Sequence, residues 1–283
     1  MTSILVTNDD GYDAPGIVKL AEAMQDLGEV RVCAPATNQS ASGHKITLHQ
    51  DIAYSRCAVG EGIPALAVGG SPADCIMLAL LGLVEKRPDI VVSGINRGEN
   101  MAQDLTYSGT VAAALEAVIN GIPAVAFSLA RADAGHPDDY RVAAQVALSV
   151  VSMVLAQGLP PLTILNVNVP PVSQLQDLRG IRLTRQGVRV YRDYLVEVDA
   201  GLVRIGGEPP EANTDELGTD VWAVHRDYVS VTPVHLDMTA HQFMANLEAW
   251  DLRLPGPENG MIQQGGRRDS ALRHRGAEKG VLP

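Results

Sequence analysis

Apolar runs of strand length alternate with helical stretches along the first two-thirds of the chain. The sequence predicts strands at residues 3–7, 29–34, 65–68, 89–93, 124–127 and 163–167, and helices at residues 16–27, 72–86, 109–120 and 140–157. Strands separated by helices of about ten or more residues pair in parallel through helical crossovers. We therefore predict an α/β protein with a doubly wound, mostly parallel sheet and helices on both faces. Ligands of such sheets bind beyond the carboxyl ends of the strands.

After Pro170 the pattern changes to short strand-like runs, at residues 181–185, 188–195, 202–205 and 228–232. An acidic loop that contains glycine and proline crosses residues 206–220, and the chain beyond Asp251 is rich in Gly, Pro and Gln. We predict three regions: an α/β catalytic core at residues 1–180, a β-rich arm and return segment at 181–250, and a disordered tail at 251–283.

Charge and hydropathy exclude several classes of protein. The formal net charge of −11 argues against a nucleic-acid backbone as the main partner. Asp9 and Asp10 interrupt the first apolar run before a secretory signal could develop. The longest apolar stretch, residues 142–156, falls short of the roughly 20 residues of a membrane span, so it predicts a buried helix. An odd number of cysteines without a C-x-x-C pair (Cys33, Cys57 and Cys75) argues against disulfides. These observations predict a cytoplasmic protein without a membrane partner.

Two adjacent carboxylates, Asp9 and Asp10, follow the first predicted strand. Leaving them unpaired at the end of a buried strand is unfavourable, because each is desolvated beside a like charge. A divalent cation relieves both penalties, and oxygen ligands without Cys or His favour magnesium, manganese or calcium over zinc. Asn-Asp-Asp-Gly is also ordinary turn chemistry, so a metal site and a solvated turn are both open at this point.

Three further polar segments follow later strands or open a helix: residues 37–44, 93–100 and 108–110. Small residues at 108–110 allow an anion to approach the unpaired N–H groups and the positive end of the helix dipole. A capping role is the alternative for Ser108. Asn96 is a ligand or a turn residue, and His44 is an acid/base or a loop histidine. The sequence leaves Arg97 open between a surface charge and a phosphate clamp.

Ser71 and Asp74 have a simpler explanation. Serine before a predicted helix, proline at its first position and an acidic residue three positions after the serine resemble a capping box. We predict a helix cap rather than a ligand site at this pair.

Together these segments resemble the SurE family, the survival-protein 5′-nucleotidases. The matching segments, in the family's order over roughly residues 1–248, are Ile4-Leu5-Val6-Thr7-Asn8-Asp9-Asp10-Gly11, Ser40-Ala41-Ser42-Gly43-His44, Gly70-Ser71-Pro72-Ala73-Asp74-Cys75, Val92-Ser93-Gly94-Ile95-Asn96-Arg97-Gly98, Ser108-Gly109-Thr110-Val111, Asn166-Val167-Asn168-Val169-Pro170 and Val229-Ser230-Val231-Thr232-Pro233. Ser71 stands where the family pattern has Thr, and nothing in the resemblance extends to the chain beyond Asp251.

The resemblance implies a divalent-metal-dependent phosphatase that hydrolyses nucleoside 5′-monophosphates to nucleoside and phosphate. Asp9 and Asp10 match the paired aspartates of the metal and catalytic site. Ser40 and Asn96 match its serine and asparagine ligands. One magnesium or manganese ion is the expected cofactor, and metal-activated water is the expected nucleophile.

The family holds the substrate phosphate at the positions of Asn8 and Ser108-Gly109-Thr110. Direct attack by Asp9 remains an alternative to water, and His44 is only a candidate general acid. The resemblance also implies a homodimer or homotetramer assembled through the β-rich arm.

Two other functions fit parts of the pattern. A dinucleotide-dependent oxidoreductase needs Gly-x-Gly-x-x-Gly after the first strand, where this chain carries Asn8-Asp9-Asp10-Gly11, so we discard it. A non-catalytic nucleotide or metal sensor that uses the same site stays open.

Overall fold

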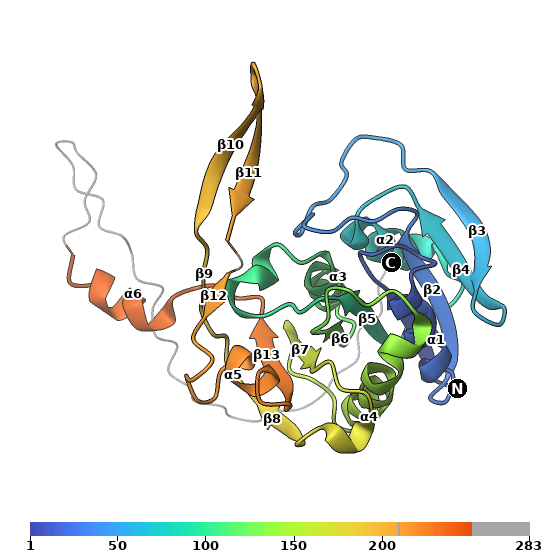
Figure 1. The fold of residues 1–283 in the computed structure, drawn as a ribbon. Coiled ribbons are helices and arrows are strands. Elements are labelled where there is room, and N and C mark those ends of the chain that lie inside the picture. The colour runs from blue at the N-terminus through green and yellow to red at the C-terminus, as the bar shows by residue number, and fades with distance from the viewer. Residues whose placement is uncertain (209, 251–283) are drawn as a thin grey trace, which may run out of the picture. The chain divides into compact units, whose positions relative to one another are not determined.

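The computed structural model describes residues 1–208 and 210–250 (Figure 1). The chain divides into two compact units, Met1–Asp237 and a second that begins at Met238. Within the second unit, helix α6 (His241–Leu247) is followed by Trp250, whose ring meets that of Phe243 edge-on at a centroid distance of 6.0 Å. The predicted tail at 251–283 lies outside the described residues.

Within the described residues, nine strands form one sheet. In spatial order they are β3 (Tyr54–Val59), β4 (Ile63–Val68), β2 (Glu29–Pro35), β1 (Ser3–Thr7), β5 (Ile90–Arg97), β6 (Ala124–Leu129), β7 (Thr163–Val169), β13 (Val229–His235) and β8 (Ile181–Leu183). All neighbours from β4 to β7 are parallel, whereas β3 and β13 run antiparallel to β4 and β7. The mostly parallel sheet predicted from the sequence is confirmed.

The strand order reverses beside β1. The chain proceeds from β1 through β2 to β4 on one side, and then returns to build β5, β6 and β7 on the other. Thr7 of β1 pairs with Ser93 of β5, so the carboxyl ends of these two strands lie together. This is the topological switch point at which open α/β sheets bind their ligands.

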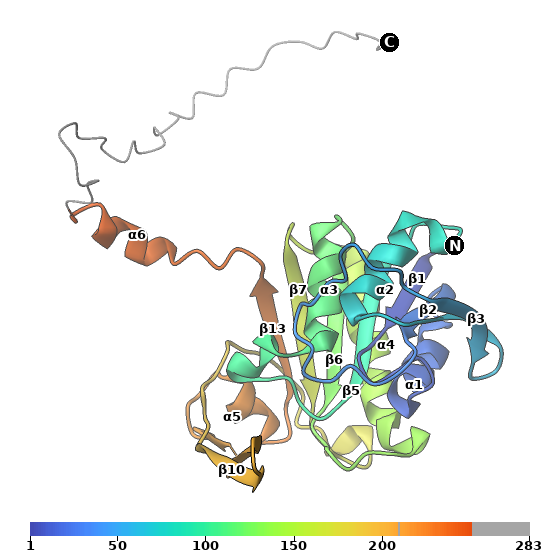
Figure 2. The same ribbon diagram turned by 90° about the horizontal axis from the view of Figure 1, so that it is seen from above.

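Helices cover both faces of the sheet (Figure 2). Helices α1 (Pro15–Met24) and α4 (Arg141–Gln157) pack on one face, and α2 (Pro72–Leu78) and α3 (Gly109–Ile119) on the other. Alternate residues of β1 enter the two cores: Ile4 and Val6 contact the α1/α4 layer, and Leu5 the α2/α3 layer. The Pro137–Gln157 stretch is long and apolar enough to cross a membrane by length and composition alone, but its most apolar window is 50% buried inside the protein.

The predicted helix at 72–86 is shorter in the structure. After α2 the chain forms a π-helical turn, η1 (Ala79–Leu83), in which Gly82 has a φ of 121°. Single turns of 3-10 helix also occur at η2 (Ala102–Thr106), η3 (Pro137–Tyr140) and η4 (Leu175–Asp177).

The region predicted as a β-rich arm divides between the sheet and a hairpin. Strands β8 and β13 complete the main sheet, and the first compact unit continues to Asp237. The antiparallel hairpin β10 (Asp193–Asp199) and β11 (Leu202–Gly207) stands apart from the sheet (Figure 1). Its stem is the short pair β9 (Arg189–Val190) and β12 (Glu211–Ala212), followed by α5 (Asp220–Val224).

Candidate functional site

The turn after β1 carries Asp9 and Asp10 and is held by the side chain of Asn8. The Asn8 Nδ2 donates to the Gly11 carbonyl at 2.8 Å, and the Gly11 N–H donates back to the Asn8 Oδ1 at 3.2 Å. Gly11 has a φ of 119°, a conformation that residues with a Cβ rarely adopt. Asn8 is fully buried and Asp9 is 3% exposed, so this is not a solvated turn.

Two other strand ends bring polar groups to this turn. From the loop after β2, the Gln39 N–H donates to the Asp9 carbonyl at 2.7 Å, and the Asn38 Nδ2 lies 3.5 Å from the Asp10 Oδ1. Ser40 follows Gln39 in the chain and is exposed, and its N–H donates to the Asn38 Oδ1 at 2.8 Å. From the end of β5, the Arg97 N–H donates to the Asp10 Oδ2 at 3.0 Å.

Asn96 is half-buried on β5, immediately before this contact. Its Nδ2 donates to the Gly98 carbonyl at 2.9 Å, so the nitrogen of the side-chain amide is engaged two residues along the same loop. Among the described residues no donor bonds to its Oδ1, so this oxygen is available as a ligand.

The N-terminus of α3 lies directly against Asp9. The Thr110 hydroxyl makes a short hydrogen bond to the Asp9 Oδ1. A Cβ on Gly109 would lie 2.7 Å from the Asp9 Cβ and 3.0 Å from its Oδ2, so only glycine fits at the first helical position. The Ser108 Oγ accepts from the Val111 N–H at 3.1 Å, which is the capping role left open as the alternative in the sequence. Because that bond uses only an oxygen lone pair, the hydroxyl proton of Ser108 can still be donated.

Burial alters the acidity of both aspartates. Desolvation raises the pKa of Asp9 to about 6, and repulsion by Asp10 adds to the rise, while the hydrogen bond from Thr110 opposes it. The pKa of Asp10 is also raised by desolvation, against the hydrogen bond from the Arg97 N–H. Both carboxyls therefore lie in an environment that favours a neighbouring positive charge.

The donor set suits a hard divalent cation. The carboxylates of Asp9 and Asp10, the Asn96 carbonyl oxygen and the Ser40 hydroxyl could each offer an oxygen of the kind that magnesium and manganese prefer. Within the described residues no group of three or more His, Cys, Asp or Glu side chains could hold a metal ion.

The Gly43 N–H donates to the Tyr107 carbonyl at 3.0 Å, just before α3, and His44 follows Gly43 in the chain. Its Nε2 is 3.0 Å from the Glu116 Oε2 on α3, about 9 Å further along the helix than Thr110. Ser71 and Asp74 form the capping box predicted from the sequence, and Asp74 also accepts from the N–H and hydroxyl of Thr47, both at 2.7 Å. These contacts anchor the loop that carries Ser40 to α2 and α3.

Sequence reasoning missed a buried network beneath the 99–106 segment. The Asn168 Oδ1 accepts from the Asn100 N–H at 2.8 Å, and the Nδ2 groups of Asn166 and Asn168 both donate to the Asn100 carbonyl at 2.9 Å. The Asn-x-Asn alternation on β7 was the available signal, because residues two apart on a strand share one face.

The chain matches the family described as "Survival protein SurE" over residues 4–193. It is 47% identical over 262 residues to the 5′-nucleotidase SurE of Geobacter sulfurreducens, covering 91% of this chain and 97% of that protein. It is 44% identical over 252 residues to the 5′-nucleotidase SurE of Chloroflexus aggregans, covering 88% and 98%. The crystal structure of the SurE protein from Aquifex aeolicus is similar with a TM-score of 0.74 and 40% identity, covering 87% of this chain and 98% of that one.

We expect Asp9→Asn to stabilise the metal-free protein at neutral pH. The pKa of Asp9 is raised from its ordinary value of 3.8 to about 6 in the folded chain. Between pH 3.8 and 6 the folded state therefore binds more protons than the unfolded state. The free energy of unfolding therefore falls as the pH rises from 3.8 to 6 and stays lower above it, by about 2–3 kcal/mol. Asparagine removes this penalty and keeps an oxygen that can accept from Thr110.

Denaturant unfolding with a chelator at pH 4.5 and 7.5 measures this effect. The advantage of Asp9→Asn should be small at pH 4.5 and should grow at pH 7.5. Asp26→Asn, which removes an exposed carboxylate at the end of α1, is the matched control and should show no such growth. An Asp9→Asn protein that is less stable than the wild type at pH 7.5 would contradict the prediction.

Proposed function

This chain belongs to the SurE family, and we infer that it is a 5′-nucleotidase that hydrolyses nucleoside 5′-monophosphates to nucleoside and phosphate. One observation carries the inference: at the switch point of the sheet, Asp9 and Asp10 meet the end of β5 and the N-terminus of α3. A carboxylate pair beside a helix N-terminus can serve a cation and a phosphate together.

We propose that Asp9, Asp10, Ser40 and Asn96 hold one divalent cation, magnesium or manganese. The raised pKa values of both aspartates and the available Asn96 Oδ1 support this set. The bound cation would supply an activated water and Lewis-acid assistance to the phosphate. Because Asp9 is already engaged by Thr110, we favour water over Asp9 as the nucleophile.

The phosphate would lie against the start of α3. Ser108 has a hydroxyl proton to donate, and the Gly109 N–H belongs to the first turn, where helix amides lack partners within the helix. These donors would neutralise charge on the equatorial oxygens, the main electrostatic demand of phosphoryl transfer.

Asn8 and Thr110 would support the site without contacting the phosphate. The Asn8 amide closes the turn with Gly11, and the Thr110 hydroxyl donates to Asp9. We propose that both hold the carboxylate pair in place for the substrate.

We also propose a cytoplasmic homodimer or homotetramer, with neither nucleic acid nor membrane as partner. The β10–β11 hairpin supports self-association, because large apolar side chains along it are more than half exposed: Tyr194, Leu195, Val198, Leu202, Val203 and Ile205. Exposed apolar strands of this kind are usually covered by a partner.

The activity test is hydrolysis of a panel of nucleoside 5′-monophosphates after exhaustive chelation and metal addition. Chelation should abolish phosphate release, manganese or magnesium should restore it, and circular dichroism should hardly change, since the apolar core does not involve the site. Full turnover after chelation would overturn the metal assignment. Binding of nucleotide without turnover, with p-nitrophenyl phosphate also left intact, would favour the sensor alternative.

Ser108→Ala should impair catalysis more than folding. Loss of the cap costs about 1 kcal/mol of stability. Loss of a transition-state hydrogen bond typically lowers kcat by about 10²–10³. Ser71→Ala removes the cap of α2 and also the hydrogen bond from the Ser71 hydroxyl to the Lys45 carbonyl, so as the comparison variant it should lose at least as much stability with a smaller loss of kcat. If the two variants have equal kcat values, Ser108 is only a cap.

Leu195 and Ile205 face each other across the hairpin and are 68% and 83% exposed, so replacing both with serine should weaken self-association. Light scattering at micromolar concentration should give a dimer or tetramer for the wild type and a smaller species for the double variant. Leu81→Ser, at a residue 79% exposed elsewhere, is the control and should keep the wild-type mass. A monomeric wild type would refute the proposal.

A further inference from the structure

The segment at residues 99–106 joins the two halves of the proposed site. Asn96 and Arg97 lie just before it at the end of β5, and Ser108 lies just after it at the start of α3. The position of this segment therefore affects both the Asp10 contact with the Arg97 N–H and the donors proposed for the phosphate. The inference below rests on the function proposed above.

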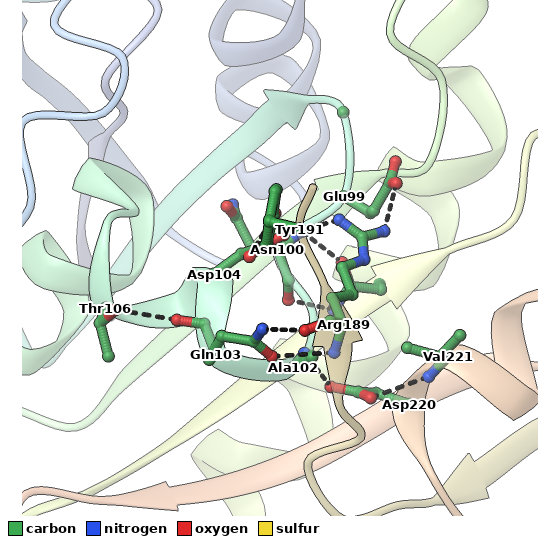
Figure 3. Close-up of polar contacts among 12 residues, drawn as sticks. Glu99, Asn100, Ala102, Gln103, Asp104, Thr106, Arg189, Tyr191, Asp220 and Val221 are labelled. Carbon is green, nitrogen blue, oxygen red and sulfur yellow. Dashed lines mark hydrogen bonds and ion pairs between the residues drawn. The ribbon is translucent and has the colours of Figure 1, made fainter. Parts of the chain in front are cut away.

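Arg189, in the stem of the hairpin, forms ion pairs and hydrogen bonds with this segment (Figure 3). Its guanidinium lies 2.5 Å from the Glu99 carboxylate and 2.6 Å from the Asp104 carboxylate. Its side chain is only 12% exposed, and that of Asp104 is 15% exposed, so this ion pair is largely shielded from water. The two carboxylates come from opposite ends of the segment.

Backbone and neighbouring groups strengthen the same contact. The Arg189 N–H donates to the Gln103 Oε1 at 2.9 Å, and the Gln103 Nε2 makes a short return bond to the Arg189 carbonyl. The Tyr191 hydroxyl donates to the Asp104 Oδ1 at 2.6 Å. These hydrogen bonds connect the hairpin stem to the segment through both main-chain and side-chain atoms.

The middle of the segment is held by further hydrogen bonds to α5, Gln186 and β7. The fully buried Asp220 of α5 accepts from the Ala102 N–H at 2.8 Å, and Gln186 donates to the Ala102 carbonyl at 2.8 Å. Asn100 is bonded to the β7 asparagines described above. The segment is thus fixed in the middle, and Arg189 connects its two ends, near Glu99 and Asp104, to the hairpin stem.

We propose that Arg189 is a positioning residue of the phosphatase site. By holding Glu99 and Asp104, it sets where Arg97 meets Asp10 and where α3 begins, and so it makes the hairpin stem part of the catalytic scaffold. A displacement of about 1 Å at the reacting groups can lower the rate by about 10²-fold, so a remote clamp of this kind affects catalysis without touching substrate.

The test compares Arg189→Met with Arg192→Met. Arg192 lies between β9 and β10 and pairs with Glu211, but both side chains are about 60% exposed, so that pair contributes little. Hydrogen exchange in the metal-free proteins reports the geometry directly. The Arg97 amide, bonded to Asp10, and the Val111 amide, bonded to Ser108, should exchange faster in Arg189→Met than in Arg192→Met.

Kinetics with a nucleoside 5′-monophosphate give the second readout. Arg189→Met should lower kcat by about 10–100-fold and raise the manganese concentration for half-maximal rate, while Arg192→Met stays within about two-fold of the wild type. A smaller folded fraction alone would lower kcat without changing that manganese concentration. If the wild type itself shows no hydrolysis, the proposed function fails, and the exchange rates alone decide the role of Arg189.

Arg189→Met leaves two carboxylates unpaired and can prevent folding, so a second variant is needed. The triple variant Arg189→Met/Glu99→Gln/Asp104→Asn removes all three charges and avoids that penalty. A folded triple variant with fast Arg97 and Val111 exchange supports the proposal. A folded triple variant whose exchange and manganese requirement match those of Arg192→Met would overturn it.

Discussion

The contact between Asp9 and the first turn of α3 is the constraint on which the site depends. Asp9 lies in the turn after β1 and is 3% exposed, and glycine at 109 allows the helix to approach within van der Waals distance of its Cβ. The buried carboxylate is tolerated because Thr110 donates to it, yet its pKa still rises to about 6. The fold therefore keeps a carboxylate in an environment in which a neighbouring positive charge would be favourable.

Two flanking segments are arranged around this contact by separate anchors. The loop that carries Ser40 is held on α2 and α3 by the Thr47–Asp74 and His44–Glu116 contacts. The 99–106 segment is held by Arg189 at Glu99 and Asp104, and by Asp220 and the buried asparagines at Ala102 and Asn100. None of these anchors is a proposed ligand, but each determines where a proposed ligand lies.

The local sequence pattern predicted the strands and helices of the core in their order along the chain, and the strand ends at which the proposed site lies. The apolar runs that became β1, β5, β6 and β7 begin within one residue of their predicted starts, because a strand buried on both faces needs continuous apolar side chains. The rule that ligands gather at the carboxyl ends of parallel strands identified the segments around Asp9 and Asn96. The caps at Ser71 and Ser108 were also predictable, since a cap involves only neighbours in sequence.

Tertiary structure decided what those residues contact. No local pattern indicates that β8 and β13 join the main sheet, that His44 meets Glu116, or that Thr110 bonds to Asp9. The partners of Arg189 are equally hidden, because Glu99 and Asp104 precede it by more than eighty residues. Sequence pattern reports which face of an element is apolar, whereas a polar side chain pairs with whatever group the folded chain brings within hydrogen-bond distance.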